Sequence, residues 1–270
     1  MDRLTVIRNL NDMLLNEMPE YRPQAREFSQ DAASQRRLLR SLMNVRPPTP
    51  LPPDFLAAQD ALLSQEREEK GSVDAMALPD LPAHPGIALW QGDITRLKAD
   101  AIVNAANSAL LGCFCPCHGC IDNAIHSAAG LQLRDECSRL MEVQSCPEPT
   151  GRAKLTRGYN LPARYVLHTV GPIVRDRVTA EDRKLLASCY RSCLELAAEH
   201  ALESVAFCCI STGEFHFPGR EAAEIAVGTV TRFLQRPSSI KKVIFNVFKD
   251  ADKQIYQKLL GPAPGAETAR

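Results

Sequence analysis

The chain has no excess of charge of either sign. Its 270 residues include 32 Lys and Arg and 32 Asp and Glu, so the formal net charge at pH 7 is zero. Proteins that hold nucleic acid or an anionic membrane through a broad electrostatic field need a basic patch or a basic net charge. The composition therefore offers no global case for either partner, and any recognition of phosphate has to be local.

Long apolar segments are also missing. No N-terminal stretch joins a charged start to an apolar core, as a secretory signal does, and no apolar run approaches the roughly 20 residues that span a bilayer. We therefore expect a cytoplasmic protein. Thiols stay reduced in that compartment, so the ten cysteines, which cluster in the sequence, favour metal binding over disulfides.

The first 80 residues are predicted to form a helical N-terminal extension. Leucine and methionine recur at helical spacing up to about Val45, with breaks at Pro19 and Pro23. A proline-rich linker, residues 46–53, must be extended, and a further helix follows from Asp54 to about Glu69. The extension could be a lid or brace on the main domain, or it could contact a partner.

Residues 81–260 are predicted to form the main domain, because strand-like and helix-like segments alternate there in the manner of an α/β fold. The predicted strands are Ile87 to Trp90, Ala101 to Val103, Tyr165 to Val170, Val205 to Ile210 and Val243 to Val247. Residues 261–270 are interpreted as a frayed tail.

Two helices of this domain have clear sequence signals. Thr179 can cap one of them together with Asp182, three residues on. The other is predicted to start at Pro218, a residue suited to a first helical turn. The side chains expected to face the core are Leu186, Tyr190, Cys193 and Ala197 in the first helix, and Ile225, Thr229 and Phe233 in the second.

The most unusual stretch of the chain is Asn104 to His126, a polar turn between a predicted strand and a helix. It contains five groups that can bind a metal: Cys113, Cys115, Cys117, His118 and Cys120. A zinc ion takes three or four protein ligands, so spacing alone does not choose among them. Two other interpretations stay open: a redox dithiol formed by Cys117 and Cys120, and a cluster of thiols without a metal.

Two further loops follow predicted strands. Ser211 to Phe215 precedes a helix, so its backbone amides could converge on an anion, although such a turn can equally be a plain connection. Asp93 follows the first predicted strand, where it could simply cap the next turn.

Taken together, these segments resemble a macrodomain. The segments that carry the resemblance are Gly92 to Thr95, Ile102 to Asn107, Cys120 to His126, Tyr165 to Pro172 and Ile210 to Pro218, in the order of the family. Gly112 to Cys120 is similar to the loop of the zinc-containing macrodomains, which are protein ADP-ribosyl hydrolases. The resemblance implies a three-layer α/β/α macrodomain with a mixed central sheet, preceded by the helical N-terminal extension.

The resemblance also implies where ADP-ribose would bind. Asp93 would accept from the adenine amine, with the Ile94 amide nearby. Asn107 would hold the distal ribose, and Phe248 falls where an aromatic side chain contacts adenine. The diphosphate would lie on the backbone amides of Ser211, Thr212, Gly213, Glu214 and Phe215.

The matched zinc ligands are Cys113, His118 and Cys120, and the matched acidic residue is Asp122. Two thiolates and one imidazole leave one position of Zn²⁺ open, as in a catalytic zinc site. Our hypothesis is that zinc binds the distal ribose hydroxyl or the attacking water, while Asn107 positions the ribose and Asp122 orients or deprotonates the water. Asp122 also lies near a predicted helix start, so a purely capping role stays open, and His126 is expected to pack or hydrogen-bond rather than bind metal.

The implied activity is removal of ADP-ribose from mono-ADP-ribosylated proteins, with linkage to an acidic side chain as the plausible case. A lipoyl-carrier protein is a possible substrate, because bacterial members are often encoded beside one. Two alternatives remain: an ADP-ribose reader with a structural zinc, and a zinc-stapled interaction or nucleic-acid module. The balanced charge disfavours the second of these.

Overall fold

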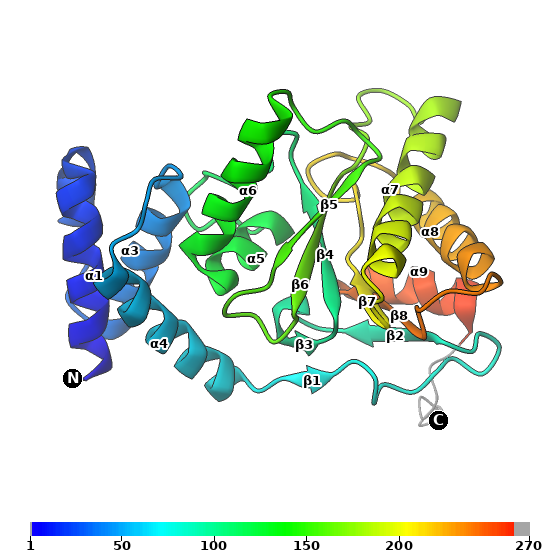
Figure 1. The fold of residues 1–270 in the computed structure, drawn as a ribbon, viewed down its shortest axis with the longest axis horizontal. Helices are drawn as coiled ribbons and strands as arrows, with labels where there is room; N and C mark the ends of the chain where they lie inside the picture. Colours follow the sequence, from blue (N-terminus) through cyan, green and yellow to red (C-terminus); the bar gives the residue numbers. More distant parts are fainter. Residues whose placement is uncertain (1, 262–270) are drawn as a thin grey trace.

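A six-stranded mixed sheet forms the centre of the molecule in the computed structural model, which describes residues 2–261 (Figure 1). The strand order is β2-β8-β7-β4-β6-β5, and only the edge strand β5 runs antiparallel to its neighbour. The strands are β2 (Ile87–Gln91), β4 (Ala101–Ala106), β5 (Ala153–Arg157), β6 (Tyr165–Val170), β7 (Ser204–Phe207) and β8 (Lys242–Val247).

Helices cover both faces of the sheet. On one face α7 (Ala180–Glu199), α8 (Gly219–Leu234) and α9 (Asp250–Leu260) pack side by side, and on the other α5 (Ile121–Ala129) and α6 (Leu131–Gln144) lie over β4 and β5 (Figure 1). Strands buried on both faces read as apolar runs in the sequence, which is why the central strands were predictable. The expected three-layer α/β/α arrangement with a mixed sheet is confirmed.

Several details differ from the sequence prediction. Strand β7 ends at Phe207, so residues 208–210 already belong to the following loop. Pro218 is the residue before α8, and the buried face of that helix is Ala222, Ala223, Ala226 and Val230. Ile225, Thr229 and Phe233 are only partly buried, because the helix is turned by about one residue from the predicted face. Strand β5 and helix α6 were not predicted.

The signals of the other long helix are confirmed. Thr179 and Asp182 form a reciprocal capping box at the start of α7, with Thr179 Oγ1 accepting from the Asp182 amide. The predicted stripe of Leu186, Tyr190, Cys193 and Ala197 is buried.

The helical extension consists of α1 (Arg3–Glu17), η1 (Pro19–Tyr21), α2 (Arg22–Ala25), α3 (Ala32–Val45) and α4 (Pro53–Lys70). The two prolines end α1 and start the short turns after it, as predicted. Buried leucines of α1, α3 and α4 form a second hydrophobic core, which Leu131 of α6 joins. The extension therefore packs against the α/β domain through a shared apolar contact and acts as a brace.

Short elements connect these two parts. The two-residue strand β1 (Val73–Asp74) pairs in parallel with β3 (Leu97–Lys98), which follows the short helix η2 (Ile94–Arg96). The predicted boundary near residue 80 falls in the connection between β1 and β2. Of the tail predicted for residues 261–270, only Gly261 is among the described residues; the rest lies outside them. Within residues 2–261 no helix has the length and apolar character needed to cross a bilayer.

We expect Leu39→Ala to lower the free energy of unfolding by about 2 to 5 kcal/mol, because Leu39 of α3 is 1% exposed and its removal leaves a cavity in the second core. Urea denaturation measures the change. Val143→Ala is the control, since Val143 is 88% exposed and its truncation should stay within about 0.5 kcal/mol. Equal effects of the two substitutions would contradict the packing described for the extension.

Candidate active site and metal centre

A cavity of about 650 Å³ opens beside the carboxyl ends of β4 and β8. This is where open α/β sheets bind ligands, because the loops that follow the parallel strands converge there. Every site residue predicted from the sequence lines this one cavity. They are Asp93, Ile94, Asn107, Cys113, His118, Cys120, Asp122, Ser211, Thr212, Gly213, Glu214, Phe215 and Phe248.

Two thiols and one imidazole converge at one side of the cavity. The ligand atoms of Cys113, His118 and Cys120 all lie within 4.8 Å of one another, and Cys113 Sγ is 3.6 Å from His118 Nδ1. His118 Nε2 faces a carboxylate oxygen of Glu214 at 3.7 Å. A carboxylate behind a histidine orients the ring and supports metal binding through its other nitrogen.

The remaining two cysteines of the loop lie elsewhere. Cys115 is exposed. Cys117 turns toward the extension, with its Sγ 3.3 Å from Ser41 Oγ and 3.6 Å from the carbonyl oxygen of Arg37. The structure therefore places Cys113, His118 and Cys120 in one cluster and leaves Cys115 and Cys117 outside it. Spacing in the sequence could not distinguish these two sets.

Electrostatics in this cluster suit a cation. Burial raises the pKa of the Cys120 thiol to about 12, and the neighbouring Cys113 adds to the rise. Two adjacent thiolates repel each other in a partly buried site, and a bound divalent ion removes that penalty. Cys and His donors together are the ligands that Zn²⁺ prefers. The donor set fits zinc, which Cys113, His118 and Cys120 would hold.

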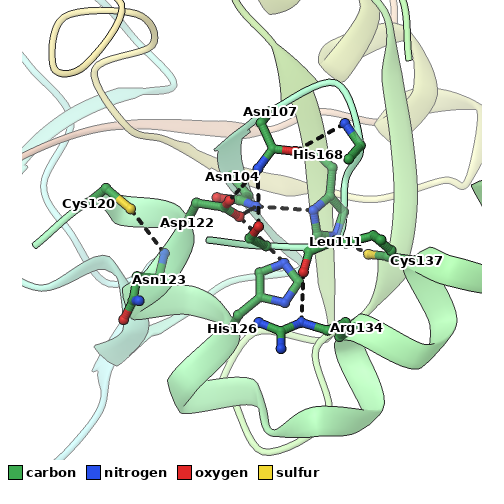
Figure 2. A network of polar contacts seen from close by, with 12 residues as sticks. Asn104, Asn107, Leu111, Cys120, Asp122, Asn123, His126, Arg134, Cys137 and His168 are labelled. Atoms are coloured by element: carbon green, nitrogen blue, oxygen red, sulfur yellow. Dashed lines mark hydrogen bonds and ion pairs between the residues drawn. The ribbon is translucent and has the colours of Figure 1, made fainter. Parts of the chain in front are cut away.

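Asp122 is the most buried acidic group of the site, with 5% of its surface exposed. Its Oδ1 accepts from Asn104 Nδ2 at 2.7 Å, and its Oδ2 lies 3.4 Å from Asn107 Nδ2 (Figure 2). Burial raises the pKa of Asp122 to about 6, against the opposing effect of the Asn104 hydrogen bond. Cys120, not Asp122, caps helix α5, so the capping alternative for Asp122 is not what the structure shows.

Behind Asp122 lies a buried polar network (Figure 2). Asn104 Nδ2 also faces His168 Nδ1 at 3.2 Å, and His168 Nε2 is 2.8 Å from Thr156 Oγ1. An amide N–H donates, so Nδ1 accepts and Nε2 carries the proton toward Thr156. Although Cys137 and His126 lie near His168 Nε2, that nitrogen has no lone pair free for a metal.

His126 behaves as the sequence analysis expected. Its Nε2 is 3.5 Å from Asp122 Oδ1, without hydrogen-bond geometry, and neither ring nitrogen has a hydrogen-bond partner among the described residues. Burial holds the pKa of His126 well below its usual value, with His168 and Arg134 adding to the effect. The ring is therefore neutral and packs behind Asp122, where Gly112 leaves it room because a Cβ there would lie 2.9 Å from it.

The loop after β7 has the features of an anion site. Ser211 adopts a left-handed conformation (φ 64°), and its buried Oγ has no hydrogen-bond partner. The backbone amides of Gly213, Glu214 and Phe215 donate to no other residue among those described. Free amides beside an orphaned hydroxyl are the donors that a diphosphate requires. Gly213 and Glu214 are exposed, so water can also satisfy their amides, and the plain-connection interpretation stays open.

At the other side of the cavity, Asp93 caps the short helix η2. Its Oδ1 accepts from the amide and hydroxyl of Thr95 at 3.0 and 2.7 Å. The capping role is therefore real, and Oδ2 stays available for a ligand. Ile94 is buried beneath the cavity floor, and Phe248 at the end of β8 is 73% exposed.

Sequence reasoning did not select several residues of the site. Asn246 reaches from β8 to the Gly92 carbonyl at 2.9 Å and lines the cavity with Lys249 and Asp252. A polar residue near the end of an apolar strand is a signal that could have identified Asn246. Arg134, whose Nε donates to the Leu111 carbonyl at 2.7 Å, comes from the unpredicted helix α6 and carried no such signal.

Comparisons with known proteins agree with this geometry. A family model described as "Macro domain" matches residues 103–226. The "Protein-ADP-ribose hydrolase" of Treponema medium is 49% identical over 256 residues, which are 93% of this chain and 96% of the relative. The chain belongs to the macrodomain family. The protein of the same name from Staphylococcus aureus (strain MSSA476) is 53% identical over 224 residues, covering 82% of this chain and 83% of the relative.

Solved structures show the same fold. The Trypanosoma brucei macrodomain in complex with ADP-ribose superimposes with a TM-score of 0.64 at 33% identity, covering 82% of this chain and 95% of that chain. The Oceanobacillus iheyensis macrodomain with ADP gives a TM-score of 0.59 at 38% identity, over 67% and 92% of the two chains.

The burial of His168 predicts how the stability of this macrodomain depends on pH. Burial lowers the pKa of His168 to about 3, whereas a histidine in the unfolded chain titrates near about 6.5. Stability is therefore lost as the pH falls below about 6.5, where the unfolded state takes up a proton and the folded state does not. In His168→Gln, whose amide does not titrate in this range, the loss between about pH 7.5 and 5.5 should be smaller by about 1 kcal/mol.

Chemical denaturation at the two pH values measures this difference. Parallel losses in wild type and His168→Gln would show that His168 does not couple its protonation to folding.

Proposed function

We propose that this macrodomain removes ADP-ribose from mono-ADP-ribosylated proteins, in a reaction that depends on zinc held by Cys113, His118 and Cys120. The observation that carries the proposal is the position of Asp122, a buried carboxylate held by two asparagine amides in the same cavity as the thiol and imidazole cluster. The hydrolase names of the Treponema medium and Staphylococcus aureus relatives support it.

The cavity suits ADP-ribose along its whole length. Asp93 Oδ2 offers an acceptor to the adenine amine, and Phe248 a surface for the ring. The free amides of residues 213–215 meet the diphosphate, and Asn107 lies beside Asp122 at the far end, where the distal ribose would bind. The modified side chain would then leave the cavity next to the metal ligands.

The chain's own groups account for the proton transfer. Water adds to the anomeric carbon of the distal ribose, the bond to the side-chain oxygen breaks, and an acidic side chain leaves as its carboxylate. Asp122 accepts the proton of the water, a role favoured by a pKa raised toward neutral pH by burial. Zinc, when bound, would supply Lewis acidity that lowers the pKa of a bound water or polarises a substrate oxygen. An acidic-side-chain linkage and a lipoyl-carrier protein as the substrate are part of the proposal.

We expect Asp122→Ala to reduce release of free ADP-ribose at least about 100-fold, because a positioned general base contributes about that factor or more. Its affinity for ADP-ribose should change only a few-fold. The assay uses a mono-ADP-ribosylated protein, and calorimetry reports the binding. Asp252→Ala is the matched control, since Asp252 lines the same cavity but lies on α9. Full turnover by Asp122→Ala would refute its role, and binding by the wild type without release would leave an ADP-ribose reader.

Removal of zinc provides a separate test. Treatment with a chelator should abolish release, and reloading with Zn²⁺ should restore it, because the proposed reaction depends on the ion that Cys113, His118 and Cys120 would hold. Cys113→Ser should lose bound zinc in elemental analysis. Cys115→Ser should keep it, since Cys115 is exposed and lies outside the cluster. Release that persists after complete stripping would exclude a zinc-dependent reaction.

A further inference from the structure

The loop that carries the metal ligands rests on helix α3 of the extension. The Cys117 amide donates to Asn44 Oδ1 at 2.9 Å, and Arg40 Nη2 donates to the carbonyl oxygen of His118 at 3.3 Å. Ser41 contacts the Cys117 thiol from the same helix. Three side chains from two adjacent turns of α3 thus contact the loop at Cys117 and at His118.

Arg40 also acts through a second residue. Its Nε and Nη2 donate to Asn123 Oδ1 at 3.2 and 2.7 Å. Asn123 Nδ2 in turn donates to the Cys115 carbonyl at 3.0 Å, and the Asn123 amide faces Cys120 Sγ at 3.4 Å. The Arg40 guanidinium therefore contacts both the backbone of His118 and the side chain of Asn123. Asn123 in turn contacts the Cys115 carbonyl and the Cys120 thiol.

The other end of the loop is held in the same way. Arg134 donates to the Leu111 carbonyl and, through Nη1, to the carbonyls of Met43 and Arg46 at the end of α3. Its guanidinium lies 4.3 Å from the centre of the Phe114 ring. Arg134 is 2% exposed, so these contacts are shielded from water.

The loop needs such support because its own backbone is irregular. Between β4 and α5 it forms no helix or strand, and Gly112 and Cys117 have positive φ values of 79° and 51°. A left-handed conformation at a cysteine costs free energy and persists only where surrounding contacts determine it. The contacts that do so at Cys117 come from α3.

We propose that Arg40 and Asn44 of the helical extension are positioning residues of the metal centre and set its affinity for zinc. The inference rests on the proposed zinc site. Ligand thiolates and imidazoles bind tightly only when their separation is held before the ion arrives, and loss of an outer partner typically weakens metal affinity about 10- to 100-fold. The extension is thus part of the metal centre as well as a brace for the fold.

The test compares two arginines of the extension. Arg40→Met removes the contacts to His118 and Asn123, whereas Arg67→Met removes a similar interdomain bond, to the Asn160 carbonyl at 3.0 Å, away from the loop. Both side chains are partly buried and line one smaller cavity of about 140 Å³ between the extension and the α/β domain. Zinc affinity of the full chain is measured by competition with a chromogenic chelator.

We expect Arg40→Met to bind zinc at least about tenfold more weakly than wild type, and Arg67→Met to match wild type. Arg40→Lys, which retains a donor, should fall between them. In Co²⁺-substituted protein, the thiolate absorption bands should change in Arg40→Met and in Asn44→Leu, and should stay unchanged in Arg67→Met. Thermal unfolding of each variant verifies that it is folded.

Equal zinc affinity in wild type, Arg40→Met and Arg67→Met would overturn the inference. So would an equal loss in both arginine variants, since the effect would then follow general stability. A wild-type chain that binds no zinc would instead refute the proposed metal centre, and the inference with it.

Discussion

The hydrogen bond from Asn104 to Asp122 joins the middle of the sheet to the first turn of helix α5. A carboxylate buried this deeply needs donors, because water is no longer available to solvate it. Asn104 occupies an inner position of β4 and pairs in register with His168 on β6. The pairing of β4 with β6 therefore fixes the position of Asn104. The Asn104 hydrogen bond in turn holds the Asp122 carboxylate, which faces the cavity beside Asn107.

The rest of the site is built around this anchor from both sides. On one side the loop of residues 211–215 presents open amides, and Glu214 reaches across to His118. On the other side Arg134 and the extension hold the cysteine loop against α5. The cavity is therefore lined by segments far apart in the sequence, and polar contacts from α3 and α6 hold the cysteine loop.

The extension links the stability of the fold to the chemistry of the site. Its apolar faces form a second core that includes Leu131 of α6, and its polar side chains point from α3 toward the cysteine loop. Buried polar contacts of this kind specify one arrangement, because an unpaired donor or acceptor at such an interface costs about 1 to 3 kcal/mol. The positions of the proposed metal ligands thus depend on helices that lie outside the α/β domain.

The resemblance to macrodomains supplied the predicted site residues, whereas local signals in the sequence determined the α/β architecture, most of the strands and the capping box at Thr179. These signals are visible along the chain because strands buried on both faces are apolar runs and caps depend on residues three apart. The edge strand β5 was missed because it is only partly buried and alternates polar residues. Spacing did not choose among Cys113, Cys115, Cys117 and Cys120, and the resemblance favoured Cys113 and Cys120. Only the tertiary structure shows that these two thiols converge with His118, while Cys115 and Cys117 lie outside the cluster. All four thiols lie within the same eight-residue stretch of the loop. The direction in which each side chain points depends on contacts with α3, Asn123 and Arg134, which lie elsewhere in the chain.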